Sequence, residues 1–222
     1  MSDATAPIDK PPSDTAVGDQ PDEEVITARR AFRTAAALSL GLLLLGVTVG
    51  AVLDPGSLRN LLRFDGIDLA IGVAAAFPLL LVLYLSADFN LLVLRTIGPA
   101  VASLSLPAAI LAAIVFAVLE ELFFRGVLQS GVEAFGFAPM TALILANVAF
   151  AAGFAASRQG FIGAFLVGCY LSAILLSGST PSLLRPILAH ALFNLALVVA
   201  IRSSGARLAA PPPDETAVAA TA

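Results

Sequence analysis

Charged residues are scarce in this chain of 222 residues: Asp, Glu, Lys and Arg make up 13% of it, whereas 59% of the residues are apolar. A soluble globular chain has about 25% charged residues. A disordered chain has fewer apolar residues than a globular one. The mean hydropathy of +0.94 therefore excludes a disordered protein, a nucleic-acid binder and an ordinary cytosolic enzyme. It indicates an integral membrane protein.

Cysteine and histidine each occur once, as Cys169 and His190. A single cysteine excludes an internal disulfide and any cysteine-ligated zinc or iron–sulfur site within one chain. A single histidine excludes every site that needs two histidines from the same chain. One lysine against eleven arginines, with much Ala, Gly and Pro, suggests a GC-rich bacterial genome.

Long apolar segments are what the sequence has in place of charge. Six segments are near the roughly 20 residues that a span requires: 35–53, 69–87, 106–132, 138–156, 160–176 and 181–201. A further segment, 89–105, contains Arg95 and Pro99 and is either an interfacial helix or a seventh span. We therefore expect an all-α, polytopic membrane helix bundle of about six to seven transmembrane helices.

The two ends of the chain differ from this apolar region. Residues 1–28 form an acidic tail and residues 205–222 an Ala- and Pro-rich tail, and we expect both to be disordered because they cannot bury apolar area. Residues 29–204 then form the transmembrane domain. Basic residues favour the cytoplasmic side of a membrane. Arg29, Arg30 and Arg33 thus predict a multi-pass protein of the cell (inner) membrane with a cytoplasmic N-terminus.

Two pairs of small residues, Gly46 with Gly50 and Gly168 with Ser172, are spaced four apart within apolar segments. Such spacing lets helix backbones approach each other closely. It is also common by chance in Gly-rich membrane helices, so it predicts no particular helix pair.

Three charged residues, Glu120, Glu121 and Arg125, lie within the apolar segment 106–132. A charge at the bilayer centre costs about 2.5–3.5 kcal/mol on insertion scales, so these side chains should face the interior of the bundle. Glu121 and Arg125 are four apart with the acid first, which predicts an ion pair. Glu120 points about 100° away, and a desolvated carboxylate without a cation suits a general base. A helix that ended near Leu119 would instead leave the acids at the interface, but the apolar residues 122–124 follow them directly.

His190 and Asn194 share one face of the segment 181–201 because they are four residues apart. A lone histidine in an apolar helix is more often an interhelical hydrogen-bond donor than a base, but a polar pair opposite intramembrane acids favours function. Glu120 lies about 14 residues into its segment and His190 about 9 into its own. In antiparallel helices that rise about 1.5 Å per residue, these depths agree to within about one turn. The two side chains can therefore meet.

The segment EELFFR at 120–125 resembles the EExxxR motif of the CAAX protease and bacteriocin-processing family (CPBP, or ABI), and HALFN at 190–194 resembles its HxxxN motif. The resemblance covers about 106–201. It implies an intramembrane endopeptidase that hydrolyses a membrane-associated protein or peptide with glutamate-activated water, so that the partners are the lipid bilayer and this substrate. It makes the catalytic residues Glu120, His190 and Asn194, with Glu121 and Arg125 as structural support.

The sequence departs from this family at one position. The family motif FxxxH corresponds to residues 150–154, where Phe154 occupies the place of the histidine. A zinc site with two histidines is thus excluded within one chain. Glu120, Glu121 and His190 could supply three zinc ligands only if Glu121 left Arg125 unpaired. We therefore expect no catalytic metal and no other cofactor.

Three functions stay open at this point. The first is an active or weakly active intramembrane protease. The second is a catalytically impaired family member that acts as a membrane binding, regulatory or immunity subunit, in which the polar residues hold helices together. The third is a small transporter or channel, which intramembrane charges would permit but for which we find no inverted repeat. The sequence predicts neither the substrate nor the oligomeric state.

Overall fold

The computed structural model describes residues 64–86, 97–155, 157–178 and 180–209, together with the isolated positions 41, 48, 61, 62, 91 and 94. The tail 1–28, the arginines that predict a cytoplasmic N-terminus and residues 210–222 lie outside the described residues. The predicted first span, 35–53, lies almost entirely outside them, and so do Gly46 and Gly50.

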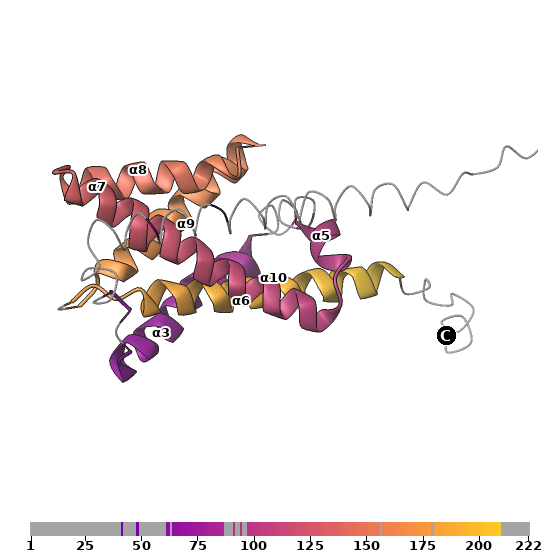
Figure 1. The fold of residues 1–222 in the computed structure, drawn as a ribbon. Helices are drawn as coiled ribbons and strands as arrows, with labels where there is room; N and C mark the ends of the chain where they lie inside the picture. Colours follow the sequence, from indigo (N-terminus) through magenta and orange to yellow (C-terminus); the bar gives the residue numbers. More distant parts are fainter. Residues whose placement is uncertain are drawn as a thin grey trace, which may run out of the picture.

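Every regular element in the described part of the chain is helical (Figure 1). The last helix continues to Ala209, into the segment that we expected to be a tail from residue 205 onwards. In chain order the elements are α3 (Gly66–Leu85), α5 (Gly98–Ala102), α6 (Leu106–Glu121), the π-helix η1 (Leu122–Gln129), α7 (Ser130–Ala134), α8 (Pro139–Ala152), α9 (Arg158–Leu176) and α10 (Leu184–Ala209).

Four helical segments of the described residues are long and apolar enough to cross a membrane. This confirms an all-α, multi-pass membrane helix bundle, and each of the four corresponds to a predicted span. They are Gly66–Leu85, Leu106–Ala134, Arg158–Leu176 and Leu184–Ser204.

One predicted span is shorter in the structure than a span requires. The segment 138–156 contains α8, which has 14 residues and ends at Ala152; at about 1.5 Å per residue it reaches about 21 Å, against a hydrocarbon core of about 30 Å. The segment 89–105 lies partly outside the described residues, and its described part contains the five-residue helix α5. The described residues thus supply four spans and one short apolar helix. The predicted first span and part of 89–105 lie outside them, so the total of six to seven helices stays a prediction.

Local sequence determines where several of these helices begin. The side-chain oxygens of Asp65, Ser105 and Ser157 each accept a hydrogen bond from a backbone N–H of the following first turn, at 3.0, 3.4 and 2.9 Å. Such caps satisfy donors that a helix leaves unpaired at its N-terminus. Between α7 and α8 the chain reverses at Gly136, whose φ of 89° is readily adopted only by glycine.

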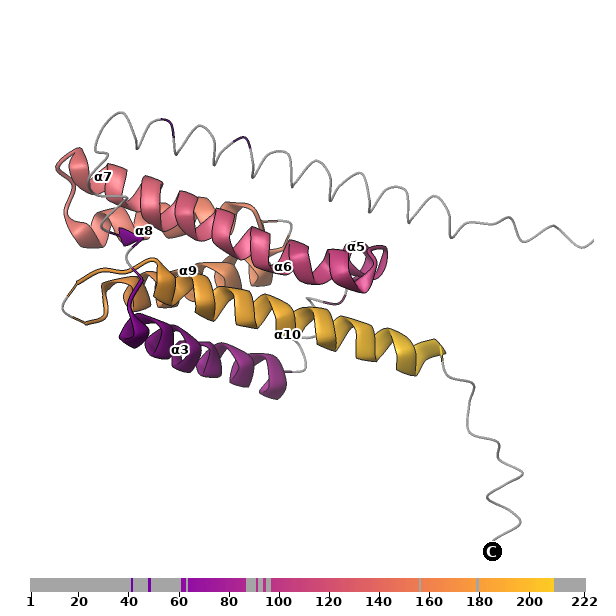
Figure 2. The same cartoon turned by 60° about the horizontal axis from the view of Figure 1, so that its bottom comes forward.

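Helix α10 lies between α3 and α6 (Figure 2) and also contacts α9. Small residues on α6 allow a close approach, because Ala109, Ala113 and Ala117 are buried on one face at steps of four. The two helices run antiparallel. Asn194, near the middle of α10, donates to the backbone oxygen of Ala113 at 3.3 Å. Arg202, nearer the C-terminal end of α10, donates to the carbonyl oxygens of Val101 and Leu104, which precede α6. On the other side of α10, leucines of α3 and α9 complete an apolar core.

Candidate active site

Two consecutive acids, Glu120 and Glu121, lie where α6 becomes η1. Glu120 is the fifteenth of the 29 residues of the Leu106–Ala134 segment, so both acids are at mid-depth of that span. The alternative prediction, in which the helix ends near Leu119, is wrong, because α6 continues through Glu120 and Glu121 into η1. The Glu121 side chain is fully buried, whereas that of Glu120 is 24% exposed.

Glu121 and Arg125 form the ion pair that their spacing predicts. Arg125 Nη1 donates to Glu121 Oε1 at 3.1 Å, and neither side chain has any exposed surface. Taking two charges out of water is unfavourable unless further hydrogen bonds satisfy them. The surroundings supply such bonds to Glu121 Oε1 and to Arg125 Nη2.

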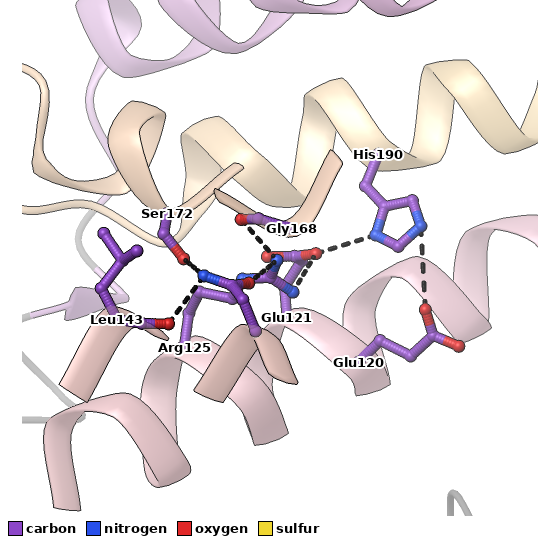
Figure 3. A network of polar contacts seen from close by, with 8 residues as sticks. Glu120, Glu121, Arg125, Leu143, Gly168, Ser172 and His190 are labelled. Carbon is purple, nitrogen blue, oxygen red and sulfur yellow. Dashed lines mark hydrogen bonds and ion pairs between the residues drawn. The ribbon is translucent and has the colours of Figure 1, made fainter. Parts of the chain in front are cut away.

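Arg125 is held by two further helices. Its Nη2 donates to Asn147 Oδ1 of α8 at 3.0 Å and to the backbone oxygen of Gly168 of α9 at 2.9 Å. The guanidinium also lies over the ring of Phe150, 5.0 Å from its centroid, which is a favourable cation–π distance. Asn147 in turn donates to Ser172 Oγ at 2.9 Å. One arginine thus joins η1 to both α8 and α9 (Figure 3).

Sequence reasoning missed Asn147 and Ser172. Asn147 carries the only amide side chain in the predicted segment 138–156, and that isolation was a usable signal. Gly168 and Ser172 have the small-residue spacing noted above, and the structure gives the reason for it. A Cβ at Gly168 would lie 2.4 Å from Asn147 Oδ1, so only glycine allows α8 and α9 to approach this closely here.

His190 brings α10 to both acids (Figure 3). Its Nδ1 is 2.8 Å from Glu121 Oε1, and its Nε2 is 3.7 Å from Glu120 Oε2. An ionised carboxylate can only accept hydrogen bonds, so we assign the proton to Nδ1, which donates to Glu121. In the neutral ring Nε2 is then an acceptor that faces Glu120.

The meeting of Glu120 and His190 agrees with the depths predicted from their positions in the two segments. Helix spacing left Glu120 without a partner on its own helix, and the structure places that partner on α10. One role is broader than predicted. Glu121 does not serve Arg125 alone, because the same oxygen atom, Oε1, contacts both Arg125 Nη1 and His190 Nδ1.

Asn194 lies one turn beyond His190 on α10, and its amide nitrogen donates to the Ala113 carbonyl, seven residues before Glu120. The structure thus places it beside the site but outside the contacts that join Glu120, Glu121 and His190. This hydrogen bond links α10 to α6, as the structural interpretation of the polar residues expects.

Phe154 lies just beyond the end of α8 and is 39% exposed. Its ring centroid is 5.5 Å from that of Phe150, and the Phe150 ring meets His190 edge-on at 6.3 Å. The position at which the family motif has a histidine therefore contacts the site through one intervening aromatic ring.

The described residues do not fit a metal ion: among them, no group of three His, Cys, Asp or Glu side chains is arranged to hold one. Glu121 could join Glu120 and His190 as a ligand only by giving up its contact with Arg125. The chemistry that this arrangement offers is therefore proton transfer between a carboxylate, an imidazole and a water molecule.

Comparison with known sequences matches residues 102–196 to the family described as type II CAAX prenyl endopeptidase, Rce1-like. Over these residues the chain is similar to that family. The Rce1-like region contains both sequence motifs, from Glu120 to Arg125 and from His190 to Asn194, and it confirms the resemblance that those motifs predicted. No curated protein and no solved structure matches the chain. The match supports a membrane endopeptidase type of function and a peptide substrate.

Proposed function

We propose that this protein is an intramembrane endopeptidase that hydrolyses a peptide bond of a membrane-associated protein or peptide with water activated by Glu120. One observation carries the proposal: at mid-depth of the bundle, Glu120 Oε2 and His190 Nε2 face each other at 3.7 Å. The family name makes a C-terminal peptide with a prenylated cysteine the first substrate class to test.

The distance between the two atoms suits a shared water molecule. At 3.7 Å, Glu120 and His190 are too far apart for a direct hydrogen bond, but a water beside them can donate one hydrogen to each. Its oxygen lone pairs then point away from both groups, towards a scissile carbonyl. As the water attacks, Glu120 takes its proton and later passes it to the leaving amine.

The remaining polar residues orient this pair. Glu121 accepts from His190 Nδ1 and fixes the ring so that Nε2 faces Glu120, as a carboxylate orients the histidine of a catalytic triad. Arg125 fixes Glu121 in turn. Asn194 has a second amide hydrogen besides the one given to Ala113, and we assign this hydrogen to the substrate carbonyl.

A second candidate function is favoured by Phe154. An aromatic ring there removes a basic, hydrogen-bonding group that the family motif supplies. The chain would then be a catalytically impaired member that binds a membrane peptide without cleaving it, acting as a regulatory or immunity subunit. The buried polar residues would serve only to join helices.

The experiment that separates the two is cleavage, by the full-length chain in lipid vesicles, of a fluorogenic peptide in which further residues follow a prenylated cysteine near the C-terminus. We expect the wild type to cleave it and Glu120→Gln and His190→Ala to lose cleavage. Gln159→Ala, which changes an exposed polar residue in the first turn of α9, is the matched control and should keep full activity. Binding of the peptide without cleavage by the wild type would favour the impaired member, and equal cleavage in all variants would refute the proposed site.

A further inference from the structure

A row of polar side chains runs from the site towards the end of the long helix. Its members, Glu121, Arg125, Gln129 and Glu133, follow one another at steps of four, and we call these four residues the polar stripe. The other residues from 122 to 132 are apolar or small. The stripe continues the buried face that carries only alanines earlier in α6.

The π-helix keeps these residues aligned. On an α-helix a step of four residues drifts by about 40° around the axis, so three steps would turn the last residue well away from the first. From Leu122 to Gln129 the helix is η1, whose hydrogen bonds to the fifth residue give a wider turn. Steps of four therefore stay closer to one line. Gln129 is accordingly 1% exposed, nearly as buried as Arg125.

Three members of the polar stripe carry a buried atom that lacks a partner. Within the described residues, Glu121 Oε2, Arg125 Nε and Gln129 Oε1 make no hydrogen bond although each is shielded from solvent. Nearly all buried polar atoms in proteins are bonded to protein or to ordered water, and leaving one unbonded costs about 1–3 kcal/mol. Three such atoms on successive turns indicate water, which can accept from Nε–H and donate to both oxygens.

The polar stripe extends from mid-membrane to the surface. The segment Leu106–Ala134 has 29 residues and is about 44 Å long at about 1.5 Å per residue, which exceeds a hydrocarbon core of about 30 Å. Its central residues are those of the site, and Glu133 lies in the last turn. Glu133 is half-buried and is the last charged residue before the turn between α7 and α8.

We propose that the polar stripe holds a file of bound water molecules that connects the Glu120–His190 site with the aqueous surface at Glu133. This file supplies the water that hydrolysis consumes, a role that rests on the proposed function. Each turnover uses one water: the C–N bond of the peptide breaks, the hydroxyl joins the acyl carbon and the hydrogen goes to the amine. The presence of the water itself does not depend on catalysis.

The first test is X-ray radiolysis, which oxidises side chains next to bound water without any probe having to enter. In a Cys169→Ser background, Gln129→Cys is compared with Val127→Cys, which lies in the same π-helix outside the polar stripe. We expect the cysteine at position 129 to be oxidised at least about tenfold faster by mass spectrometry, because a hydrated thiol is the reactive one. Equal rates would overturn the proposal.

The second test uses the sign of a stability change and covers the case in which the cysteine variants fold poorly. If Gln129 Oε1 bonds to water, Gln129→Met leaves that water with one hydrogen bond fewer and weakens its hold on its other partners. The Tm in detergent then falls by at least about 2 °C. If Oε1 is dry, removing an unbonded polar atom raises the Tm. Neither test involves a substrate, so hydration without cleavage would refute the proposed function alone, and cleavage without hydration would refute the water file alone.

Discussion

His190 Nδ1 and Glu121 Oε1 lie 2.8 Å apart, although the two residues are separated by 69 positions in the sequence. This contact gives the two neighbouring acids different tasks in the proposed mechanism. Glu121 contacts both Arg125 and His190. The Glu120 side chain is partly exposed, and its contact with His190 is longer. The acids can therefore be distinguished by experiment.

Glu121→Gln and Arg125→Met should each destabilise the fold strongly. Either change leaves the partner as an uncompensated buried charge, which costs about 3–5 kcal/mol. The measurement is unfolding in detergent followed by circular dichroism. Glu120→Gln, one residue away, is the matched control and should unfold close to the wild type, since its side chain is partly exposed and makes one long contact. Equal stability of Glu120→Gln and Glu121→Gln would contradict the division of tasks.

Much of this arrangement follows from the sequence, because charges stand out in an apolar chain. The four-residue step from Glu121 to Arg125 gives their pairing, and the distances of Glu120 and His190 from the starts of their segments give a common depth. Apolar length gives four of the spans. These inferences need only the helical repeat and the bilayer thickness.

What the sequence does not give is the rotation of one helix against the next. A helical repeat shows which face of α10 carries His190, but not that Glu121 rather than Glu120 receives its Nδ1–H. The steps of four from Glu121 to Gln129 are compatible with an α-helix as well as with the π-helix η1, so residue types alone do not distinguish the two. The approach of Asn147 to Gly168 likewise depends on the distance between α8 and α9, which many small-residue pairs would permit.

Gly168→Ala should disrupt the site from a distance. The new Cβ would lie 2.4 Å from Asn147 Oδ1 and 3.2 Å from Phe150 Cδ1, and Asn147 cannot move without giving up its bond to Arg125. Overpacking of this kind costs about 1–3 kcal/mol, and we expect a lower Tm together with weaker peptide cleavage.

The control for this prediction is Gly131→Ala in α7, where a Cβ meets nothing within 4 Å. Alanine in a helix is favoured over glycine by about 0.5–1 kcal/mol, so this variant should be as stable as the wild type or more so. A Gly168→Ala variant that matched it in Tm and in activity would show that α8 and α9 can separate freely.

Asp68 and Arg185 form a second buried ion pair, between α3 and α10. Arg185 Nε and Nη2 lie 2.7 and 2.6 Å from Asp68 Oδ1, and His190 follows Arg185 by little more than one turn. Asp68→Leu or Arg185→Met alone should lower the Tm, because each leaves a buried charge. The double variant should recover most of the loss, since apolar pairs often replace buried ion pairs without cost. Additive losses in this double-mutant cycle would show that the two residues act separately.

Phe154→His tests the departure of this chain from the family motif. The side chain is 39% exposed, and exchanges at such positions usually change stability by about 0.5 kcal/mol or less. An imidazole there would bring a second basic group to the ring of Phe150, next to His190. A well-placed acid–base group contributes about 10²–10⁴-fold to a reaction, so we expect faster cleavage of the prenylated peptide at an unchanged Tm.

Phe154→Leu is the control, because it changes the shape of the side chain without adding a base. If Phe154→His cleaves faster than both the wild type and Phe154→Leu, the lost histidine limits a site that is otherwise intact. If the wild type is inactive and Phe154→His alone cleaves, the natural chain is the impaired, binding member of the family. If all three cleave at the same rate, Glu120 and His190 suffice for hydrolysis, and the aromatic ring at position 154 belongs to the packing around Phe150.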